Sequence, residues 1–270
     1  MGLKFLSFPV RGIDISAYDK WLIVLKILGK VHVVIVRIGH GTKTDARFKE
    51  FWSSLKGKIF RLAYFYMDYY SNHLPDQVAV YGIGDYEWGV IQGRNAWNNM
   101  KDDNDYPLVF LDIENGDPNY APEIDSVWDR AEKVADGFFD TYDSLSNITN
   151  GIYASLSKFK QFSQRFRHRP AYVAFYDDYD DNGILRTRES VIKEMRDSGW
   201  TGPILFWQYA SDGDVDDDGI GDGLSYGLGR PVMDLDVWMD TENAWENFKR
   251  RIMNILLYIA QIGQRAPIWA

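Results

Sequence analysis

Five carboxylates lie in or directly after apolar, β-branched runs of this sequence, where acidic residues are uncommon. Asp14 lies in one run, Asp112 and Glu114 lie at the end of a second, and Asp234 and Asp236 lie in a third. An unpaired charge is costly to bury, so acids in such runs indicate a chemical role. Asp112 and Glu114 are two residues apart, and residues at that spacing point to the same face of a strand.

The apolar runs that carry these acids recur along the chain. They are continuous rather than alternating, which is typical of strands buried on both faces of a parallel sheet covered by helices. Eight such strands in β/α alternation over about 240 residues predict an α/β fold, a (β/α)₈ barrel. An open doubly wound sheet is the alternative, but no glycine-rich phosphate loop follows the first strand. The eight runs are Val10–Ile15, Val31–Ile38, Ile59–Tyr66, Pro107–Ile113, Asn150–Tyr153, Ala171–Tyr176, Pro203–Tyr209 and Val232–Trp238.

Helical spacing of apolar residues fills several of the gaps between these strands. It predicts helices over Asp45–Leu55, Pro122–Leu145, Leu156–Phe166 and Arg188–Ser198. We expect one domain, with residues 1–240 forming the barrel and residues 241–270 forming a C-terminal helical extension packed on it. The helix Thr241–Gln264 has one apolar side, which either closes the bottom of the barrel or contacts a partner or a second copy of the chain.

A barrel would bring the acidic strand ends together. In a closed barrel the first and last strands are neighbours and the fourth lies opposite, and active sites form at the C-terminal strand ends. Acids facing each other across the mouth suit cleavage of a glycosidic bond by a proton donor and a second carboxylate. Aromatic residues at other strand ends suit the apolar faces of sugars. These candidate substrate-binding residues are Tyr64, Tyr66, Tyr153, Tyr176, Trp207 and Tyr209.

Seven short motifs, in order and at plausible spacing, resemble glycoside hydrolase family 25, the Chalaropsis-type lysozymes of phage endolysins and bacterial autolysins. The resemblance covers roughly residues 9–240. The motifs are Gly12-Ile13-Asp14-Ile15-Ser16, Val34-Ile35-Val36-Arg37, Ala63-Tyr64, Leu111-Asp112-Ile113-Glu114, Gly151-Ile152-Tyr153, Trp207-Gln208-Tyr209 and Asp234-Leu235-Asp236-Val237.

This resemblance implies a modified β/α barrel that hydrolyses the β-1,4 bond between N-acetylmuramic acid and N-acetylglucosamine in peptidoglycan, without a required cofactor. It implies that Glu114 is the general acid and that Asp14, Asp112 and Asp234 complete the acidic quartet. It leaves open whether an aspartate or the N-acetyl group of the substrate is the nucleophile. The chain departs from the family at two places: Phe65-Tyr66 replaces the frequent His-Phe, and Asp236 replaces the usual Asn.

Asp236 is therefore expected to contact substrate and to add a negative charge that raises neighbouring pKa values. Two alternatives to the muramidase stay open, namely a non-catalytic glycan-binding barrel and a glycosidase acting on another N-acetylated polysaccharide. A family 18 chitinase is excluded by its strand-four pattern, because Pro107 and Phe110 stand where that pattern requires Asp.

Composition narrows the remaining functions. The net charge of −9 argues against nucleic acid as a partner, and the absence of cysteine excludes disulfides and thiolate metal sites. There is no run of about 18 apolar residues to span a membrane and no evident signal peptide. We expect action on peptidoglycan strands of the bacterial cell wall, either outside the cell or after release from a phage-infected cell.

Two acidic loops have the alternating oxygen ligands and the glycine of calcium-binding loops. The first has the full twelve-residue spacing, and the second has Ser225 at the twelfth position. A structural Ca²⁺ in each loop is one interpretation of this pattern, and a solvated acidic loop, or for the second a loop that lines the cleft, is the other. The candidate ligands are Asp178, Asp180, Asn182 and Glu189 in the first loop, and Asp214, Asp216, Asp218 and Asp222 in the second.

Overall fold

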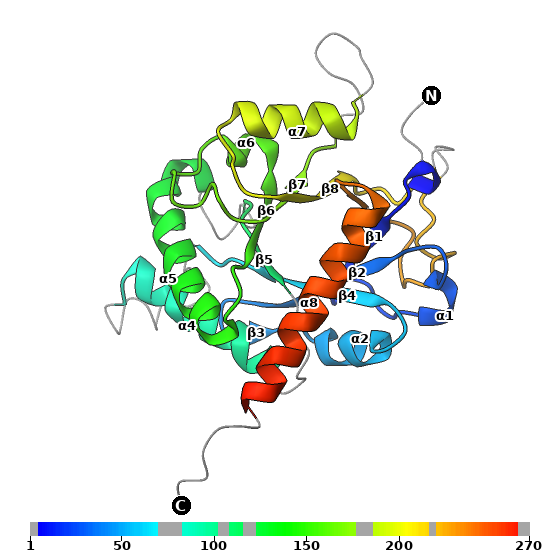
Figure 1. Ribbon diagram of the computed structural model, residues 1–270, viewed down its shortest axis with the longest axis horizontal. Helices are drawn as coiled ribbons and strands as arrows, with labels where there is room; N and C mark the ends of the chain where they lie inside the picture. The colour runs from blue at the N-terminus through cyan, green and yellow to red at the C-terminus, as the bar shows by residue number, and fades with distance from the viewer. Residues whose placement is uncertain are drawn as a thin grey trace, which may run out of the picture.

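The computed structural model describes residues 5–69, 83–101, 108–115, 123–176, 186–215 and 220–263. Its centre is a closed barrel of eight strands, drawn in Figure 1 with helices around it. The barrel closes because β1 pairs with both β2 and β9, and a short ninth strand, β3, pairs with β2 only. The strands are β1 (Arg11–Ile15), β2 (Val33–His40), β3 (Lys43–Thr44), β4 (Phe60–Tyr66), β5 (Val109–Asp112), β6 (Gly151–Ser155), β7 (Ala171–Ala174), β8 (Ile204–Ala210) and β9 (Asp234–Trp238).

All eight predicted strands are present, but one runs in the opposite direction from that expected. Seven barrel strands run parallel, whereas β9 is antiparallel to both β8 and β1. A parallel barrel would have placed the last residue of this strand at the mouth. The reversal instead brings its first residue, Asp234, level with Asp14 of β1. The fold is therefore a modified TIM-type barrel, and the modification decides which acid of β9 reaches the mouth.

Helices surround the barrel, mostly where the apolar spacing predicts them. The predicted helix over Leu156–Phe166 is shorter, because only residues 156–159 are helical, and the helix at 85–100 was not predicted. The helices are α1 (Val24–Ile27), α2 (Phe48–Leu55), α4 (Asp85–Met100), α5 (Trp128–Ser146), α6 (Leu156–Phe159), α7 (Arg188–Asp197) and α8 (Glu242–Gly263), with short 3-10 helices η1 (Phe5–Ser7) and η4 (Ile124–Val127).

Helices α4 and α5 lie side by side (Figure 1) and approach each other through glycines. A Cβ atom added at Gly89 would lie 1.9 Å from the backbone oxygen of Val134, and one at Gly137 would lie 1.9 Å from that of Tyr86. Neither distance leaves room for a side chain. Each glycine lowers the propensity of its own helix, Gly89 in α4 and Gly137 in α5, but together they allow the two helices to pack at close backbone contact.

Two apolar layers hold the barrel. The outer layer lies between strands and helices, and the inner layer fills the barrel itself with residues such as Val33, Leu62 and Phe206. Trp245 of α8 belongs to the inner layer, and its ring centroid lies 5.2 Å from those of Phe60 and Trp238. Helix α8 thus packs against the barrel at the start of its length, as Figure 1 shows in orange. Among the described residues, no helix is both long and apolar enough to cross a bilayer.

Candidate active site

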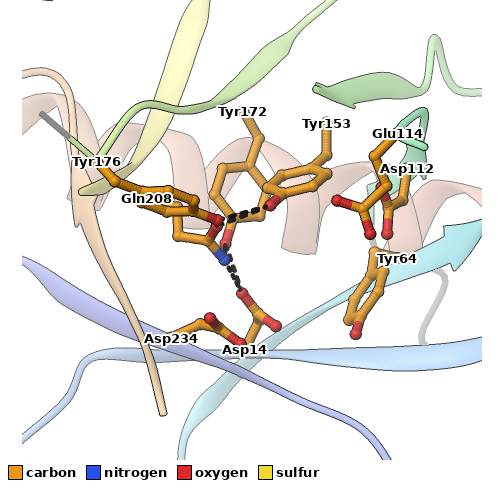
Figure 2. Close-up of a pocket in the computed structure, with 9 residues that line it drawn as sticks. All are labelled: Asp14, Tyr64, Asp112, Glu114, Tyr153, Tyr172, Tyr176, Gln208 and Asp234. Atoms are coloured by element: carbon orange, nitrogen blue, oxygen red, sulfur yellow. Dashed lines mark hydrogen bonds between the residues drawn. The ribbon is translucent and has the colours of Figure 1, made fainter. Parts of the chain in front are cut away.

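A cavity at the mouth of the barrel contains four carboxyl groups, four tyrosines and one glutamine (Figure 2). It encloses about 520 Å³ of empty space, including its opening to solvent. Seven different elements contribute, because inward-facing residues at the strand ends all converge there. The lining residues are Asp14, Tyr64, Asp112, Glu114, Tyr153, Tyr172, Tyr176, Gln208 and Asp234.

The four acids form two pairs that face each other across the cavity (Figure 2). Asp14 and Asp234 are register partners on β1 and β9. Asp112 ends β5, and Glu114 follows two residues later. The segment that carries Glu114 is fixed by Asn115, whose side chain accepts from the backbone N–H of Ile124 and whose carbonyl accepts from Tyr66. The predicted acidic quartet is therefore assembled at one site.

Asp14 is held by two hydrogen-bond donors. The Tyr172 hydroxyl lies 2.8 Å from Asp14 Oδ2, and Gln208 Nε2 donates to the same oxygen at 2.6 Å. Gln208 is fixed in turn, because its Oε1 accepts from the hydroxyls of Tyr153, at 2.7 Å, and Tyr176. This network aims the amide N–H at Asp14, which favours the ionised form of that carboxyl.

The carboxyl groups are too close and too enclosed for all of them to ionise at neutral pH. Burial raises the pKa of Asp14 to about 6, with the hydrogen bonds from Tyr172 and Gln208 opposing the rise. Removal from bulk water, reinforced by the charge of Asp14, raises the pKa of Glu114 to about 7 and that of Asp234 to about 9. Near neutral pH the site therefore holds both protonated and ionised carboxyls, the combination needed for acid catalysis beside a stabilising charge.

Asp112 lies deeper than Glu114 and is 3% exposed. Burial, with repulsion from Glu114 and Asp14, raises its pKa well above the ordinary aspartate value. Its Oδ1 atom is buried without a hydrogen-bond partner among the described residues. An unpartnered buried oxygen costs less on a neutral carboxyl than on a carboxylate, which agrees with the raised pKa of Asp112.

One arginine lies beside the pair formed by Asp14 and Asp234. Arg230 donates to buried Asp19 at 2.6 Å, and its Nη2 lies 3.8 Å from Asp234 Oδ2. Asp19 is itself fixed by the backbone N–H of Ser16, directly after β1. The positive charge of Arg230 opposes the rise in the pKa values of Asp14 and Asp234, and Asp14, which has the lower pKa of the two, is better suited to hold negative charge.

The structure places the predicted aromatic residues in two groups. Tyr64, Tyr153 and Tyr176 line the cavity, and Tyr66 lies on the same face of β4 as Tyr64. Trp207 and Tyr209 do not reach it, which corrects their assignment to substrate. They flank Gln208 on β8, and because side chains alternate along a strand, they point into the outer apolar layer while Gln208 points inward.

Two lining residues, Tyr172 and Gln208, were not predicted as site residues. The alternation along β7 and β8 could have identified them, since Tyr172 is two residues from Ala174 and four from Tyr176 on the inward face. Asp236, expected at substrate, does not line the cavity. It is 0% exposed and lies two residues further into the barrel than Asp234, where its Oδ1 atom makes a hydrogen bond with the hydroxyl of Tyr172.

The calcium-loop predictions lie largely outside the described residues, which exclude Asp178, Asp180, Asn182, Asp216 and Asp218. Of the remaining candidates, Glu189 is exposed in the first turn of α7. Asp222 accepts from the backbone N–H of Val215, at 3.3 Å, and from the hydroxyl of Ser225. Within the described part of the chain, no three histidine, aspartate or glutamate side chains are grouped to hold a metal ion.

Solved structures of family 25 glycoside hydrolases share this fold. A family 25 glycosyl hydrolase from Bacillus anthracis aligns with 89% of this chain and 93% of its own, at 13% identity and a TM-score of 0.61. A muramidase from Trichobolus zukalii aligns over 87% and 96%, at 19% identity and a TM-score of 0.59. The spore cortex lytic enzyme of Clostridium perfringens aligns over 87% and 68%, at 16% identity and a TM-score of 0.60. Comparisons with protein-family models and with curated proteins gave no match. The fold is thus the lysozyme-type barrel predicted from the seven motifs.

Proposed function

We propose that the protein is a peptidoglycan hydrolase of the muramidase type, which cleaves the β-1,4 bond between N-acetylmuramic acid and N-acetylglucosamine. The observation that carries the proposal is the pairing of Glu114 and Asp112 on one side of the cavity with Asp14 and Asp234 on the other. A glycosidase needs a protonated carboxyl on one side of the bond and a negative charge near the anomeric carbon. The fold shared with muramidases supports peptidoglycan as the substrate class.

In this proposal Glu114 is the proton donor. Its pKa of about 7 keeps much of it protonated at neutral pH, and it lies at the solvent-accessible end of the acidic pair. Glu114 donates its proton to the glycosidic oxygen as the bond from that oxygen to the anomeric carbon breaks. The leaving sugar departs as an alcohol, and a water molecule later adds to the anomeric carbon and returns a proton to Glu114.

Asp14 would stabilise the positive charge that develops on the sugar. Its donors Tyr172 and Gln208 and the nearby Arg230 all favour the carboxylate, and its pKa, at about 6, is lower than those of Glu114 and Asp234. Asp234, beside it, has a pKa of about 9 and is mostly protonated at neutral pH, so Asp14 carries the charge there. The tyrosines supply apolar faces and hydroxyls for the two sugar rings next to the bond.

We propose that the protein acts on the bacterial cell wall and that its partner there is a glycan strand. A modular autolysin from Streptococcus pneumoniae, 46% of which aligns with 85% of this chain at 18% identity and a TM-score of 0.58, has been solved with a synthetic peptidoglycan ligand. By analogy, the cavity would take a glycan strand of the bacterial cell wall.

The test compares Glu114→Gln with a matched control, Glu123→Gln, at an exposed glutamate that precedes η4. Glutamine keeps the shape of the side chain but has no transferable proton. Release of soluble fragments from purified peptidoglycan should fall about 100-fold or more in Glu114→Gln and stay normal in the control. Binding to peptidoglycan should survive. Binding without hydrolysis by the unaltered protein would favour a glycan-binding barrel, and hydrolysis only of another N-acetylated polysaccharide would favour a different glycosidase.

A further inference from the structure

The hydroxyl of Tyr172 lies between two carboxyl groups. It is 2.8 Å from Asp14 Oδ2 and also makes a hydrogen bond with Asp236 Oδ1. A phenol has one proton to donate. If both aspartates were ionised, one of the two contacts would bring oxygen atoms together with no hydrogen between them. One of the two carboxyls must therefore carry a proton and donate it to the Tyr172 oxygen.

The surroundings of the two aspartates differ. Asp14 also accepts a hydrogen bond from Gln208 Nε2, at 2.6 Å, and it lines the open cavity. Asp236 is 0% exposed, and its Oδ2 atom has no hydrogen-bond partner among the described residues. An ionised carboxylate with a bare buried oxygen is far more costly than a neutral carboxyl in the same place. The proton therefore belongs on Asp236.

Among the residues that the structure describes, no positively charged group acts on Asp236. The register partners of Asp236 are Gly12 on β1 and Gln208 on β8, and the ionisable groups that face it are Asp14, Asp234 and Tyr172. Burial, with repulsion from Asp14, raises the pKa of Asp236 well above the ordinary aspartate value, and the contact with Tyr172 opposes this rise without cancelling it. The electrostatics and the hydrogen bonds both favour the protonated form of Asp236.

We infer that Asp236 is a buried neutral carboxylic acid that directs the Tyr172 proton onto Asp14. The hydroxyl of Asp236 donates to the oxygen of Tyr172, and the hydroxyl of Tyr172 then donates to Asp14. Asp236 is thus a positioning residue that acts through Tyr172 and touches no substrate. The catalytic consequence rests on the proposed role of Asp14, whereas the protonation state of Asp236 does not.

A protonated Asp236 adds no negative charge to the cavity. The family resemblance places an Asn at this position. An ionised Asp236 would have added a further negative charge to the site. A protonated carboxyl adds none. Like the amide of Asn, it combines a donor group with an acceptor oxygen, so both residues can direct the Tyr172 proton in the same way.

The direct test is infrared spectroscopy of the full chain and of Asp236→Asn at neutral pH. A protonated carboxyl gives a C=O stretching band that shifts on exchange into D₂O. The difference spectrum should contain one such band, lost in Asp236→Asn. Absence of that band would overturn the inference. Because the measurement needs no substrate, it is decisive even if the protein fails to cleave peptidoglycan.

The positioning role is tested by the pH dependence of kcat/KM for Asp236→Asn and Asp236→Leu. Asn retains a donor, so its profile should match the unaltered protein within about threefold. Leu has none, so the Asp14 carboxylate loses support, its pKa rises, and the acidic limb moves to higher pH. In a Tyr172→Phe background the Asn and Leu variants should not differ. Equal impairment of Asn and Leu in the presence of Tyr172 would contradict the role, and should the Leu variant fail to fold, the infrared result and the Asn profile decide.

Discussion

Gln208 Nε2 lies 2.6 Å from Asp14 Oδ2, and the two residues come from strands that are not neighbours in the barrel. The contact spans the strand β9 that separates β8 from β1. It exists because Gln208 and Asp14 both point inward at the same height. It gives Asp14 a donor that cannot lose its proton, which distinguishes Asp14 from the other acids of the cavity.

Replacing Gln208 with Glu tests this contact with almost no change in shape. The amide donor becomes an acidic oxygen, so Asp14 loses a hydrogen bond and gains a repulsive neighbour. The pKa of Asp14 should rise, the acidic limb of kcat/KM should move to higher pH, and kcat/KM at pH 6 should fall by about tenfold or more, or roughly 1.4 kcal/mol. Gln164→Glu, at an exposed glutamine, is the control. A Gln208→Glu variant with an unaltered pH profile would remove Gln208 from the network.

Asp234→Asn tests whether Asp234, at the start of β9, carries a negative charge. The amide preserves the side-chain volume and is neutral, as Asp234 itself mostly is at neutral pH with its pKa of about 9. We therefore expect kcat at pH 7 to change by less than about threefold, because Asp14 supplies the charge that faces the developing oxocarbenium ion. Asp240→Asn, at an exposed aspartate just after β9, should leave kcat unchanged. A loss of about 2–4 kcal/mol in transition-state stabilisation, seen as a lower kcat, would instead show that Asp234 is ionised during the reaction.

Stability should fall as the pH rises from 5 to 9. The folded protein holds protons on Asp14, Glu114 and Asp234 up to pH values of about 6, 7 and 9, whereas unfolded carboxyls release theirs near pH 4. The native state binds more protons in this window, so the stabilisation present below pH 4 is lost as the pH rises through these values.

Thermal unfolding measures this slope, at roughly 2–4 °C per kcal/mol for chains of about this size. Asp112→Asn removes one buried acid and should flatten the fall in Tm between pH 5 and pH 9. Asp129→Asn, at an exposed aspartate of α5, changes the net charge equally and should not flatten it. A Tm that rises over this range would contradict the protonation pattern of the site.

The two acidic loops can be tested for Ca²⁺ binding by its effect on thermal stability. If Ca²⁺ binds a loop only in the folded chain, EDTA lowers the Tm and added Ca²⁺ restores it by mass action. Asp180→Asn should abolish the response if the first loop is the site, and Asp216→Asn if it is the second. A melting curve indifferent to both EDTA and Ca²⁺ would leave both as solvated acidic loops.

Much of the barrel could be predicted from the sequence, because a continuous apolar run records burial on both faces. An apolar run does not show whether its strand is parallel or antiparallel to its neighbours, because Val232–Trp238 would be equally apolar in either direction. The antiparallel course of β9 comes from its pairing with both β8 and β1. Helix α4 was missed for another reason: Gly89 and Gly93 lower its intrinsic propensity, and only its contact with α5 explains them.

The acids of the site were predictable as a set, whereas their individual environments were not. A carboxylate in an apolar strand is visible in the sequence, but its depth is not. Asp234 and Asp236 share one face of β9, and only the pairing of Asp14 with Asp234 shows which of them reaches the cavity. Likewise, Trp207 and Gln208 are adjacent in sequence and point to opposite sides of the barrel wall.

The most direct test of the central proposal is the identity of the sugar at the new reducing ends of digested peptidoglycan. The fragments are reduced with borohydride and analysed by mass spectrometry. Cleavage by the proposed chemistry leaves N-acetylmuramic acid at every new reducing end, so the fragments should carry N-acetylmuramitol, and they should be absent from a digest with Glu114→Gln. Fragments that end in N-acetylglucosaminitol, or none from the unaltered protein, would contradict the account.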